Sequence, residues 1–258
     1  MKNLEYIVKK SHASKQGVNE LKTLRLLKLP EVFECIIHKR INRFTVEAFL
    51  NGEFSIIYLN NTGRLTGILE KNRKGYCIPN KSGRIRYRLI AIGKDEYSYL
   101  VDTSLQERAF LEAVKEGYIP WLKNCILSKR NYRIEGEVVD YAFNCSDGLV
   151  LVELKSAVME LPGRYAGYPD APTLRARKQL EALARYVRTG GKGMVVFVAG
   201  IPLANGFKLY CGADRKIKEY IDEAVDAGVV FKSTNIFYDP KSNSVMLGHT
   251  DLPVNLNC

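Results

Sequence analysis

Asp140, Glu153 and Lys155 are residues of the types that hydrolyse phosphodiesters with the help of a divalent metal ion. Carboxylate oxygens are ligands that Mg²⁺ prefers, and the ion keeps several water molecules when it binds to them. A lysine beside the ion can orient a water molecule, or help to deprotonate it, for attack on phosphorus. The three residues therefore predict a metal-dependent, nuclease-like site.

The sequence around these residues predicts a β-hairpin that brings them together. Two segments rich in apolar side chains, residues 138–143 and 149–155, flank a short loop at residues 145–148 that ends in glycine. With this loop length, Asp140 falls opposite Glu153, and directly opposed side chains lie about 5 Å apart. The lysine follows the glutamate by two positions, so both side chains share one face of their strand.

A solvated ion pair at two strand ends is the alternative interpretation of the same residues, because such pairs are common and are worth about 0–1 kcal/mol. The glutamate and the lysine, however, close an apolar run in which polar groups are otherwise unfavourable. The three histidines, His12, His38 and His249, are not close to the acids in sequence, but this chemistry needs no histidine.

Arg84, Arg86 and Arg88 alternate with apolar residues, which on a strand places three guanidinium groups on one face. Between Arg64 and Lys94 the chain holds nine Lys and Arg residues and one acid. This density suits a groove that follows phosphates, where guanidinium groups make bidentate contacts. A charged, solvated sheet face is the alternative.

A second basic group lies on the helix expected after Pro172. Like charges on one helix repel each other unless an anion such as a phosphate lies between them. The group consists of Arg175, Arg177, Lys178, Arg185 and Arg188.

The distribution of charge predicts an anionic partner. The formal net charge is +11, and residues 1–100 carry 19 Lys and Arg against 9 Asp and Glu, whereas residues 101–258 carry 20 against 19. A basic first part favours nucleic acid, here DNA, with an acidic membrane surface second. Charge that only keeps the protein in solution is the simpler alternative.

The composition excludes several classes of protein. No stretch approaches the roughly 20 apolar residues of a membrane span, and the first residues lack the apolar segment of a signal peptide. The six cysteines are scattered without a CxxC pair, so we expect free thiols in a reducing cytosol rather than a zinc site or disulfides. These features predict a cytoplasmic protein without a membrane segment or a small-molecule cofactor.

The pattern of apolar residues predicts a basic lead-in at residues 1–28 and a small β-barrel at residues 29–103. The lead-in has apolar residues at helical spacing, and Pro30 would end that helix. The barrel part alternates short β-rich runs with glycine-containing turns, which suits an OB-like fold. Its expected strands are residues 31–41, 44–50, 54–59, 85–92 and 97–101.

Residues 104–258 alternate strands with helices, which predicts an α/β domain with a mixed central sheet flanked by helices. A helix over residues 104–116, with Ser104 as its N-cap, opens this part, and a hairpin around Pro240 closes it. Strands are expected at residues 138–143, 149–155, 194–199, 229–231, 235–238 and 244–247, and further helices at 173–188 and 214–227.

Several segments together resemble the sugar fermentation stimulation protein (SfsA) family over nearly the whole chain after the lead-in. The Asn61-Thr62-Gly63 turn and residues 169–175 are the specific features of the resemblance, whereas the acidic motif alone is not specific. The matching segments are residues 43–44, 61–65, 101–103, 139–141, 152–156 and 168–175.

The resemblance implies an N-terminal OB-like domain, a C-terminal domain similar to the PD-(D/E)XK nuclease fold, DNA binding, and a role in regulating sugar metabolism. Asp140, Glu153 and Lys155 occupy the metal and lysine positions of the nuclease-like pattern. Glu112 matches an acid that adds a metal ligand. The implied cofactor is Mg²⁺ or Mn²⁺.

The chain departs from the family pattern at Asn60, Val138 and Gln179, where the family usually has proline, arginine and histidine. These departures bear on substrate contacts more than on the metal. The residues expected to bind nucleic acid, the last three of them from the resemblance, are Arg64, Arg84, Arg86, Arg88, Arg108, Arg175 and Lys178.

Functions of different classes fit these features. One is a metal-dependent nuclease that cleaves DNA, and another is a non-catalytic DNA-binding regulator of sugar metabolism that retains a nuclease-like fold. An enzyme that processes RNA or nucleotides is a third, since a barrel that stacks single strands does not exclude RNA. The intact acidic triad favours the nuclease, because a fold kept only for binding has no need of buried carboxylates. The sequence leaves the oligomeric state open, a homodimer included.

Overall fold

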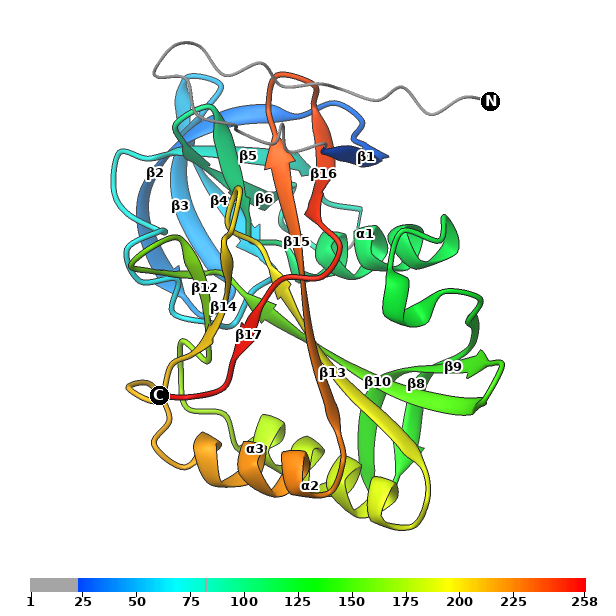
Figure 1. The fold of residues 1–258 in the computed structure, drawn as a ribbon. Helices are drawn as coiled ribbons and strands as arrows, with labels where there is room; N and C mark the ends of the chain where they lie inside the picture. The colour runs from blue at the N-terminus through cyan, green and yellow to red at the C-terminus, as the bar shows by residue number, and fades with distance from the viewer. Residues whose placement is uncertain (1–22, 82) are drawn as a thin grey trace, which may run out of the picture.

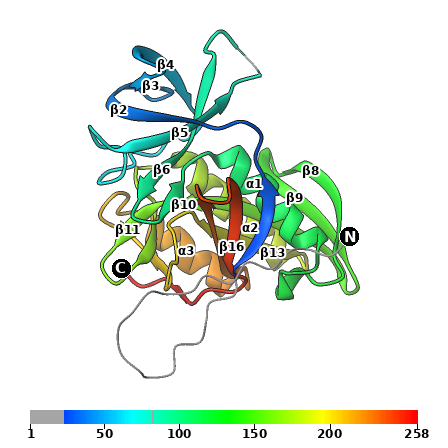
Figure 2. The same cartoon turned by 90° about the horizontal axis from the view of Figure 1, so that it is seen from above.

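The computed structural model describes residues 23–81 and 83–258, and its strands and helices form a β-barrel joined to a larger mixed sheet (Figures 1 and 2). Most of the expected basic lead-in, residues 1–28, lies outside the described residues. In the part of the chain that the structure describes, no helix is long and apolar enough to cross a membrane.

Strands make up most of the regular structure. The strands are β1 (Leu24–Lys28), β2 (Phe33–Asn42), β3 (Thr45–Leu50), β4 (Glu53–Leu59), β5 (Lys74–Pro79), β6 (Tyr87–Lys94), β7 (Tyr97–Leu100), β8 (Ile126–Ile134), β9 (Glu137–Cys145), β10 (Gly148–Ala157), β11 (Met159–Leu161), β12 (Tyr165–Tyr168), β13 (Lys192–Ala199), β14 (Gly206–Leu209), β15 (Val230–Asp239), β16 (Ser244–His249) and β17 (Val254–Asn255). The helices are α1 (Thr103–Lys115), the short 3₁₀ helix η1 (Pro120–Leu122), α2 (Leu174–Arg188) and α3 (Ile217–Asp226).

Strands β2 to β6 close a small barrel in the order β4-β3-β2-β5-β6, because β4 also pairs with β6 in parallel. Val46 and Ala48, two positions apart on β3, point inward and are fully buried. Ile57, Leu59 and Leu89 from the neighbouring strands fill the same interior. This alternation of inward and outward residues is what a barrel wall requires, and it confirms the expected OB-like barrel.

The strand β5 is missing from the sequence-based expectation. Its segment contains Gly75 and Pro79, and both residue types are depleted in strands. Gly75 packs so closely on the paired strand β2 that an added Cβ would lie 2.8 Å from the sulfur of Cys35. Gly75 therefore weakens the strand pattern in the sequence, but the close approach of β2 and β5 requires a glycine at this position.

The sheet continues from β7 through β15, β13, β10 and β9 to β8, which forms its edge. Strands β10, β13 and β15 run parallel, whereas β9 and β8 are antiparallel additions. Buried residues of α1 pack with Val152 and Val196 on one face, and those of α2 and α3 pack with Leu151 and Val195 on the other. Helices thus cover both faces of a mixed sheet, as the alternating pattern predicts.

The helices α1 and α2 each begin with a side-chain cap. Asp102, and not Ser104, caps α1, because its Oδ1 accepts a hydrogen bond from the Leu105 amide at 2.8 Å. Thr173 caps α2 by accepting from the Ala176 amide at 3.2 Å. Each cap satisfies an amide that the first helical turn leaves without a partner. Helix α1 therefore begins at Thr103, one residue before the expected start.

Several segments differ from the expectation because long-range strand pairing overrides local spacing. Leu24–Lys28 forms a strand paired with β16, where the spacing of apolar residues predicts a helix. The strands expected at residues 229–231 and 235–238 are one continuous strand, β15. Strand β8 and a small separate sheet of β11, β12, β14 and β17 complete the fold.

Four of the six cysteines form disulfides, which corrects the expectation of free thiols. Cys125 bonds to Cys145, and Cys211 bonds to Cys258. The remaining two are free and buried in the barrel. The bonded pairs lie 20 and 47 residues apart in sequence, so the scattered spacing does not reveal which residues the fold brings together.

Candidate active site

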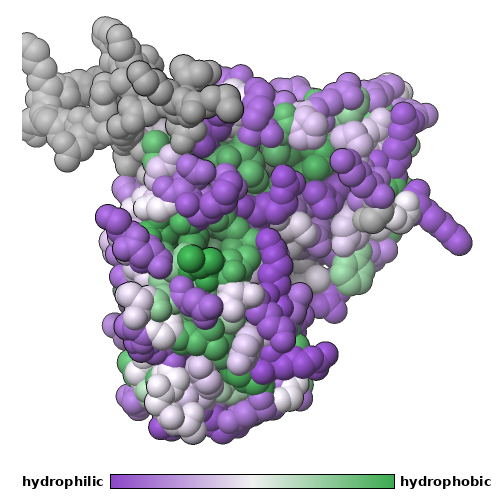
Figure 3. Space-filling view, turned by 90° about the vertical axis from the view of Figure 1, so that its right-hand side faces the viewer, coloured by the Kyte–Doolittle hydropathy of each residue, from purple (hydrophilic) through white to green (hydrophobic). Residues whose placement is uncertain are grey.

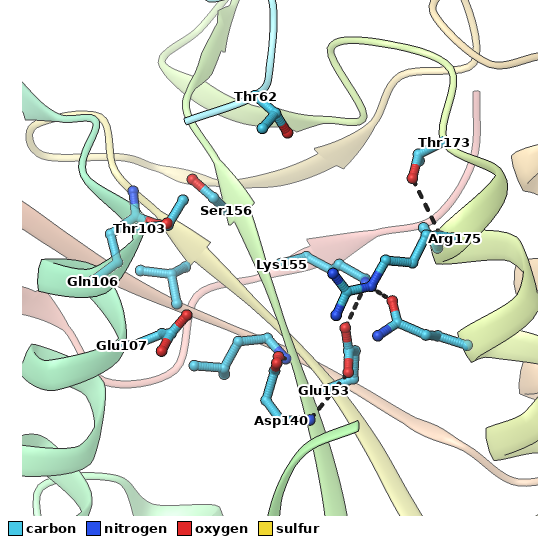
Figure 4. Close-up of a pocket in the computed structure, with 14 residues that line it drawn as sticks. Thr62, Thr103, Gln106, Glu107, Asp140, Glu153, Lys155, Ser156, Thr173 and Arg175 are labelled. Atoms are coloured by element: carbon cyan, nitrogen blue, oxygen red, sulfur yellow. Dashed lines mark hydrogen bonds and ion pairs between the residues drawn. The ribbon is translucent and has the colours of Figure 1, made fainter. Parts of the chain in front are cut away.

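Asp140, Glu153 and Lys155 line a cavity of about 290 Å³ (Figure 4). Strands β9 and β10 supply these three residues, the N-terminal halves of α1 and α2 supply polar side chains, and the loop after β4 supplies Thr62. Because two helices begin at the cavity, the positive ends of their dipoles favour negative charge there. The structure therefore brings the predicted acids and lysine to one point.

Asp140 and Glu153 oppose each other across the hairpin of β9 and β10, as the loop length predicts. Val152 pairs with Tyr141, so the next positions along the two strands are the acids. The Asp140 amide donates to Glu153 Oε2 at 3.2 Å, and the Leu154 amide donates to Asp140 Oδ2 at 2.8 Å. Backbone groups of two paired strands thus hold both carboxylates.

Lys155 is fixed between an acid and an amide. Its Nζ donates to Glu153 Oε1 at 2.6 Å and to Gln179 Oε1 at 2.7 Å. Gln179 in turn donates from Nε2 to the carbonyl oxygen of Val138 at 2.7 Å. The glutamine therefore connects α2 to β9 and holds the lysine in place.

Burial sets the protonation of these groups. Burial, opposed by Lys155 and reinforced by Asp140, raises the pKa of Glu153 to about 7. Burial also raises the pKa of Asp140, although the Leu154 amide, Lys155 and Arg175 oppose it. For Lys155, burial is the largest single effect and lowers the pKa, but the attractions of Glu153, Tyr168 and Asp140 together outweigh it, so the pKa stands above its ordinary value. Lys155 is therefore a cation at neutral pH, suited to orienting a ligand rather than accepting a proton.

Glu107 of α1 is a third acid at the cavity. The Tyr141 hydroxyl donates to its Oε2 at 3.2 Å, and burial together with the charge of Asp140 raises its pKa. Glu112 lies elsewhere on the helix, 3.2 Å from Lys115, and lines a different groove. This placement corrects the expectation that Glu112 joins the acids. Glu107 and Glu112 are five positions apart, which is not a whole number of 3.6-residue turns, so the two side chains point in different directions from the helix axis.

The basic residues predicted to bind nucleic acid do not form one surface. Arg175 lines the cavity and extends toward the lysine and the acids (Figure 4). Lys178 is exposed on the next turn of α2, outside the cavity. Arg64 is exposed in the loop after β4, close in sequence to Thr62. Arg108 is exposed on α1 and lines the same groove as Glu112.

The predicted three-arginine face does not form. Arg84 and Arg86 are exposed and precede β6, which begins at Tyr87, and the Arg86 guanidinium lies 5.3 Å from the centre of the Tyr87 ring. Arg88 Nε lies 3.0 Å from Oδ2 of Asp102, whose side chain is fully buried. Arg88 therefore ties the barrel to the start of α1, and the strand begins too late to align all three residues.

Contacts from both halves of the chain fix the turn at residues 61–63 that carries Thr62 to the cavity. The Arg40 guanidinium donates to the Gly63 carbonyl oxygen at 2.5 Å. The carboxylate of Asp170 lies so close to Gly63 that a Cβ at the glycine would overlap it. The positioning roles of Arg40 and Asp170 were not expected from the sequence, although Asp170 lies in the segment that carries the family resemblance.

The donor set fits a hard divalent cation such as Mg²⁺ or Mn²⁺. Asp140 and Glu153 offer carboxylate oxygens, and among the described residues no hydrogen bond reaches Asp140 Oδ1. No group of three or more His, Cys, Asp or Glu side chains in residues 23–81 and 83–258 is arranged to hold a metal. Two carboxylates would therefore leave most of the coordination shell to water, an arrangement that Mg²⁺ accepts.

Two family models match the chain. The model described as "SfsA N-terminal OB domain" matches residues 39–101, and that described as "Sugar fermentation stimulation protein RE domain" matches residues 104–242. Together they span the barrel and most of the mixed sheet.

Relatives match over most of their length. The sugar fermentation stimulation protein homolog of Pyrococcus furiosus is 32% identical over 231 residues, which are 90% of this chain and 100% of the relative. The homolog of Archaeoglobus fulgidus is 33% identical over 231 residues, 90% and 99% of the two chains. A solved structure described as Pyrococcus furiosus SfsA in complex with Ca²⁺ superposes with a TM-score of 0.86 at 32% identity, covering 90% of this chain and 99% of that chain.

Proposed function

Because the chain belongs to the sugar fermentation stimulation protein (SfsA) family, we propose that it binds DNA and hydrolyses its phosphodiester bonds with a divalent metal ion. Asp140 and Glu153 hold the ion, and Lys155 orients the water or a phosphate oxygen. The basic groups outside the cavity hold the DNA backbone.

The observation that carries this proposal is the pairing of a buried carboxylate, Glu153, with a half-buried one, Asp140, beside a fixed ammonium. Glu153 is only 4% exposed, and its elevated pKa reflects the free energy needed to keep it ionised there. Apolar side chains at these positions would serve the stability of the sheet at least as well. A bound cation would compensate the negative charge of Glu153 and Asp140, which supports a metal ion between the two carboxylates.

Each residue at the cavity has a role that its contacts support. A bound Mg²⁺ or Mn²⁺ supplies Lewis-acid charge and an acidified water. Lys155, held by Glu153 and Gln179, presents a fixed positive charge. Arg175 and the N-terminal ends of α1 and α2 attract a phosphate toward the acids.

The solved relative supports the class of metal. Its description records a complex with Ca²⁺, another hard cation that prefers oxygen ligands. Ca²⁺ is therefore a useful probe of binding for this chain, and Mg²⁺ and Mn²⁺ are the ions to test for turnover.

Incubation of the purified protein with plasmid and single-stranded DNA in Mg²⁺ or Mn²⁺ tests the proposal. We expect cleavage that Asp140→Ala and Lys155→Ala reduce at least about 100-fold, the usual effect of removing one preorganised electrostatic group. Asp147→Asn is the matched control, because Asp147 is an exposed acid in the turn of the same hairpin. Cleavage that persists in Asp140→Ala would place the chemistry elsewhere.

A non-catalytic DNA-binding regulator is the second candidate. The observation in its favour is that the described residues offer no ready-made group of three metal-ligating side chains. Intact DNA binding without cleavage, across Mg²⁺, Mn²⁺ and both forms of DNA, would establish the regulator and overturn the nuclease.

A further inference from the structure

A groove of about 920 Å³ lies where the C-terminal half of α1 faces β8 and β9. Leu111, Ile126, Leu127 and Phe143 make its floor largely apolar, and Ile126 is 74% exposed. Figure 3 shows apolar side chains in a hollow on this side of the molecule, bordered by hydrophilic residues. An apolar hollow of this size is a candidate binding surface.

The rim of the groove is cationic. Arg108, Lys115, Lys123 and Arg130 line it, and Glu112 is the one acid among the described lining residues. Glu112 already forms an ion pair with Lys115 at 3.2 Å. The remaining three cations form no ion pair with any residue that the structure describes, so the rim is complementary to an anionic ligand.

The groove adjoins the acidic cavity, because Glu107 lines the cavity and the next residue of α1, Arg108, lines the groove. Tyr141 follows Asp140 on β9 and donates its hydroxyl proton to Glu107, while Arg130 lies over the Tyr141 ring at 5.6 Å. Tyr141 itself is buried, and Arg130, which lines the groove, interacts electrostatically with Glu107 of the cavity. From Asp140 to Phe143 the strand rises about 10 Å, at roughly 3.3 Å per residue. A flexible polymer can therefore occupy both places at once.

We propose that this groove binds an unpaired DNA strand that extends from the acidic cavity. The backbone phosphates contact Arg108, Lys123 and Arg130, and the bases rest on the apolar floor around Ile126. The inference rests on the proposed function and adds a substrate class to it: duplex DNA that carries a single-stranded extension. Proteins hold unpaired strands without reading their sequence in cationic grooves whose side chains contact the faces of the bases; here the cations follow the backbone and the exposed floor is aliphatic.

An acidic peptide with apolar anchors would match the floor and the rim as well. The position of the groove next to the cavity decides between the two ligands, because a DNA strand held at Asp140 and Glu153 must leave in some direction. The direction past Glu107 and Arg108 leads to three cations and an apolar floor.

Fluorescence anisotropy in Ca²⁺, without Mg²⁺ or Mn²⁺, tests the inference. The probes are a blunt duplex and the same duplex with an unpaired extension on either strand. We expect an extension to raise the affinity of the wild-type protein about tenfold, through added phosphate contacts with the three cations and apolar contacts of the bases with the floor. Ile126→Asp is expected to abolish this gain, and Lys123→Glu to reduce it. Val225→Asp is the control, because Val225 is an apolar residue of α3 that is 46% exposed and lies outside the groove.

Equal affinity of the wild-type protein for blunt and extended duplexes would overturn the groove as a DNA site, while metal-dependent cleavage of plasmid DNA would stand. A gain that Val225→Asp also loses would show that the effect is not local and would overturn the inference too. Equal DNA affinities, with binding of poly-glutamate that Ile126→Asp abolishes, would assign the groove to an acidic protein partner. Failure to bind or cleave any DNA would instead reject the proposed function itself.

Discussion

The acidic cavity and the cationic residues around the barrel are built in opposite ways. In the cavity, Glu153 and Gln179 are buried, Asp140 and Lys155 are half-buried, and the four are bonded to one another and to the backbone. On the barrel, Arg84 and Arg86 are exposed. A buried network loses its function when one member changes, whereas exposed cations contribute separately and can replace one another. A single substitution should therefore have a much larger effect in a buried pair than at an exposed arginine.

The ion pair of Arg88 and Asp102 tests this comparison with the largest expected effect. Arg88 is a barrel residue, but its partner Asp102 is fully buried. Arg88→Ala leaves the fully buried Asp102 carboxylate without its ion-pair partner, so we expect the free energy of unfolding to fall by about 3 kcal/mol. Arg86→Ala should change the free energy of unfolding by less than about 0.5 kcal/mol. Chemical denaturation measures both, and equal effects would break the distinction between buried and exposed cations.

A smaller effect is expected for the exposed arginines in DNA binding. Replacing Arg84 and Arg86 together with alanine should weaken DNA binding and lower its dependence on salt by up to about 0.9 units of log–log slope for each lost phosphate contact. Lys218→Ala provides the control, because Lys218 is paired with Asp222 on α3. A salt titration of the binding constant gives the slope, and an unchanged slope would remove these arginines from the DNA-binding surface.

The sequence predicts the cavity better than its surroundings because the hairpin is specified locally. A short loop sets which residues oppose each other, and the apolar side chains of the two flanking strands can be buried in only one register. To predict that Glu107 lines the cavity, one must know which face of α1 meets the sheet. The family pattern suggested Glu112 instead. The position of Arg88 depends on where β6 begins, and the pairing of β6 with β4 and β5 decides that start. Such long-range pairings also fix β1 and the disulfides, and local spacing does not report them.

The barrel and the α/β arrangement were predictable for the same reason as the hairpin, since their periodic patterns extend over many residues. The strand β5 was not, because Gly75 interrupts the pattern where two strands approach closely. Features that depend on a close contact between distant segments are therefore the ones that the sequence conceals.

Calorimetric titration of the metal-free protein with Mn²⁺ tests the metal site most directly. A proton and a metal ion compete for Glu153, whose pKa is about 7, so the affinity should rise as the pH rises and the carboxyl ionises. Below pH 7 we expect about a tenfold loss of affinity for each unit of pH, and a much smaller change above it.

We expect one Mn²⁺ per chain at pH 8, with weaker binding at pH 6, and loss of that binding in Asp140→Asn but not in the hairpin-turn variant Asp147→Asn. Mn²⁺ binding of the same affinity in the wild-type protein and Asp140→Asn, or none at either pH, would rule out a metal site at Asp140 and Glu153.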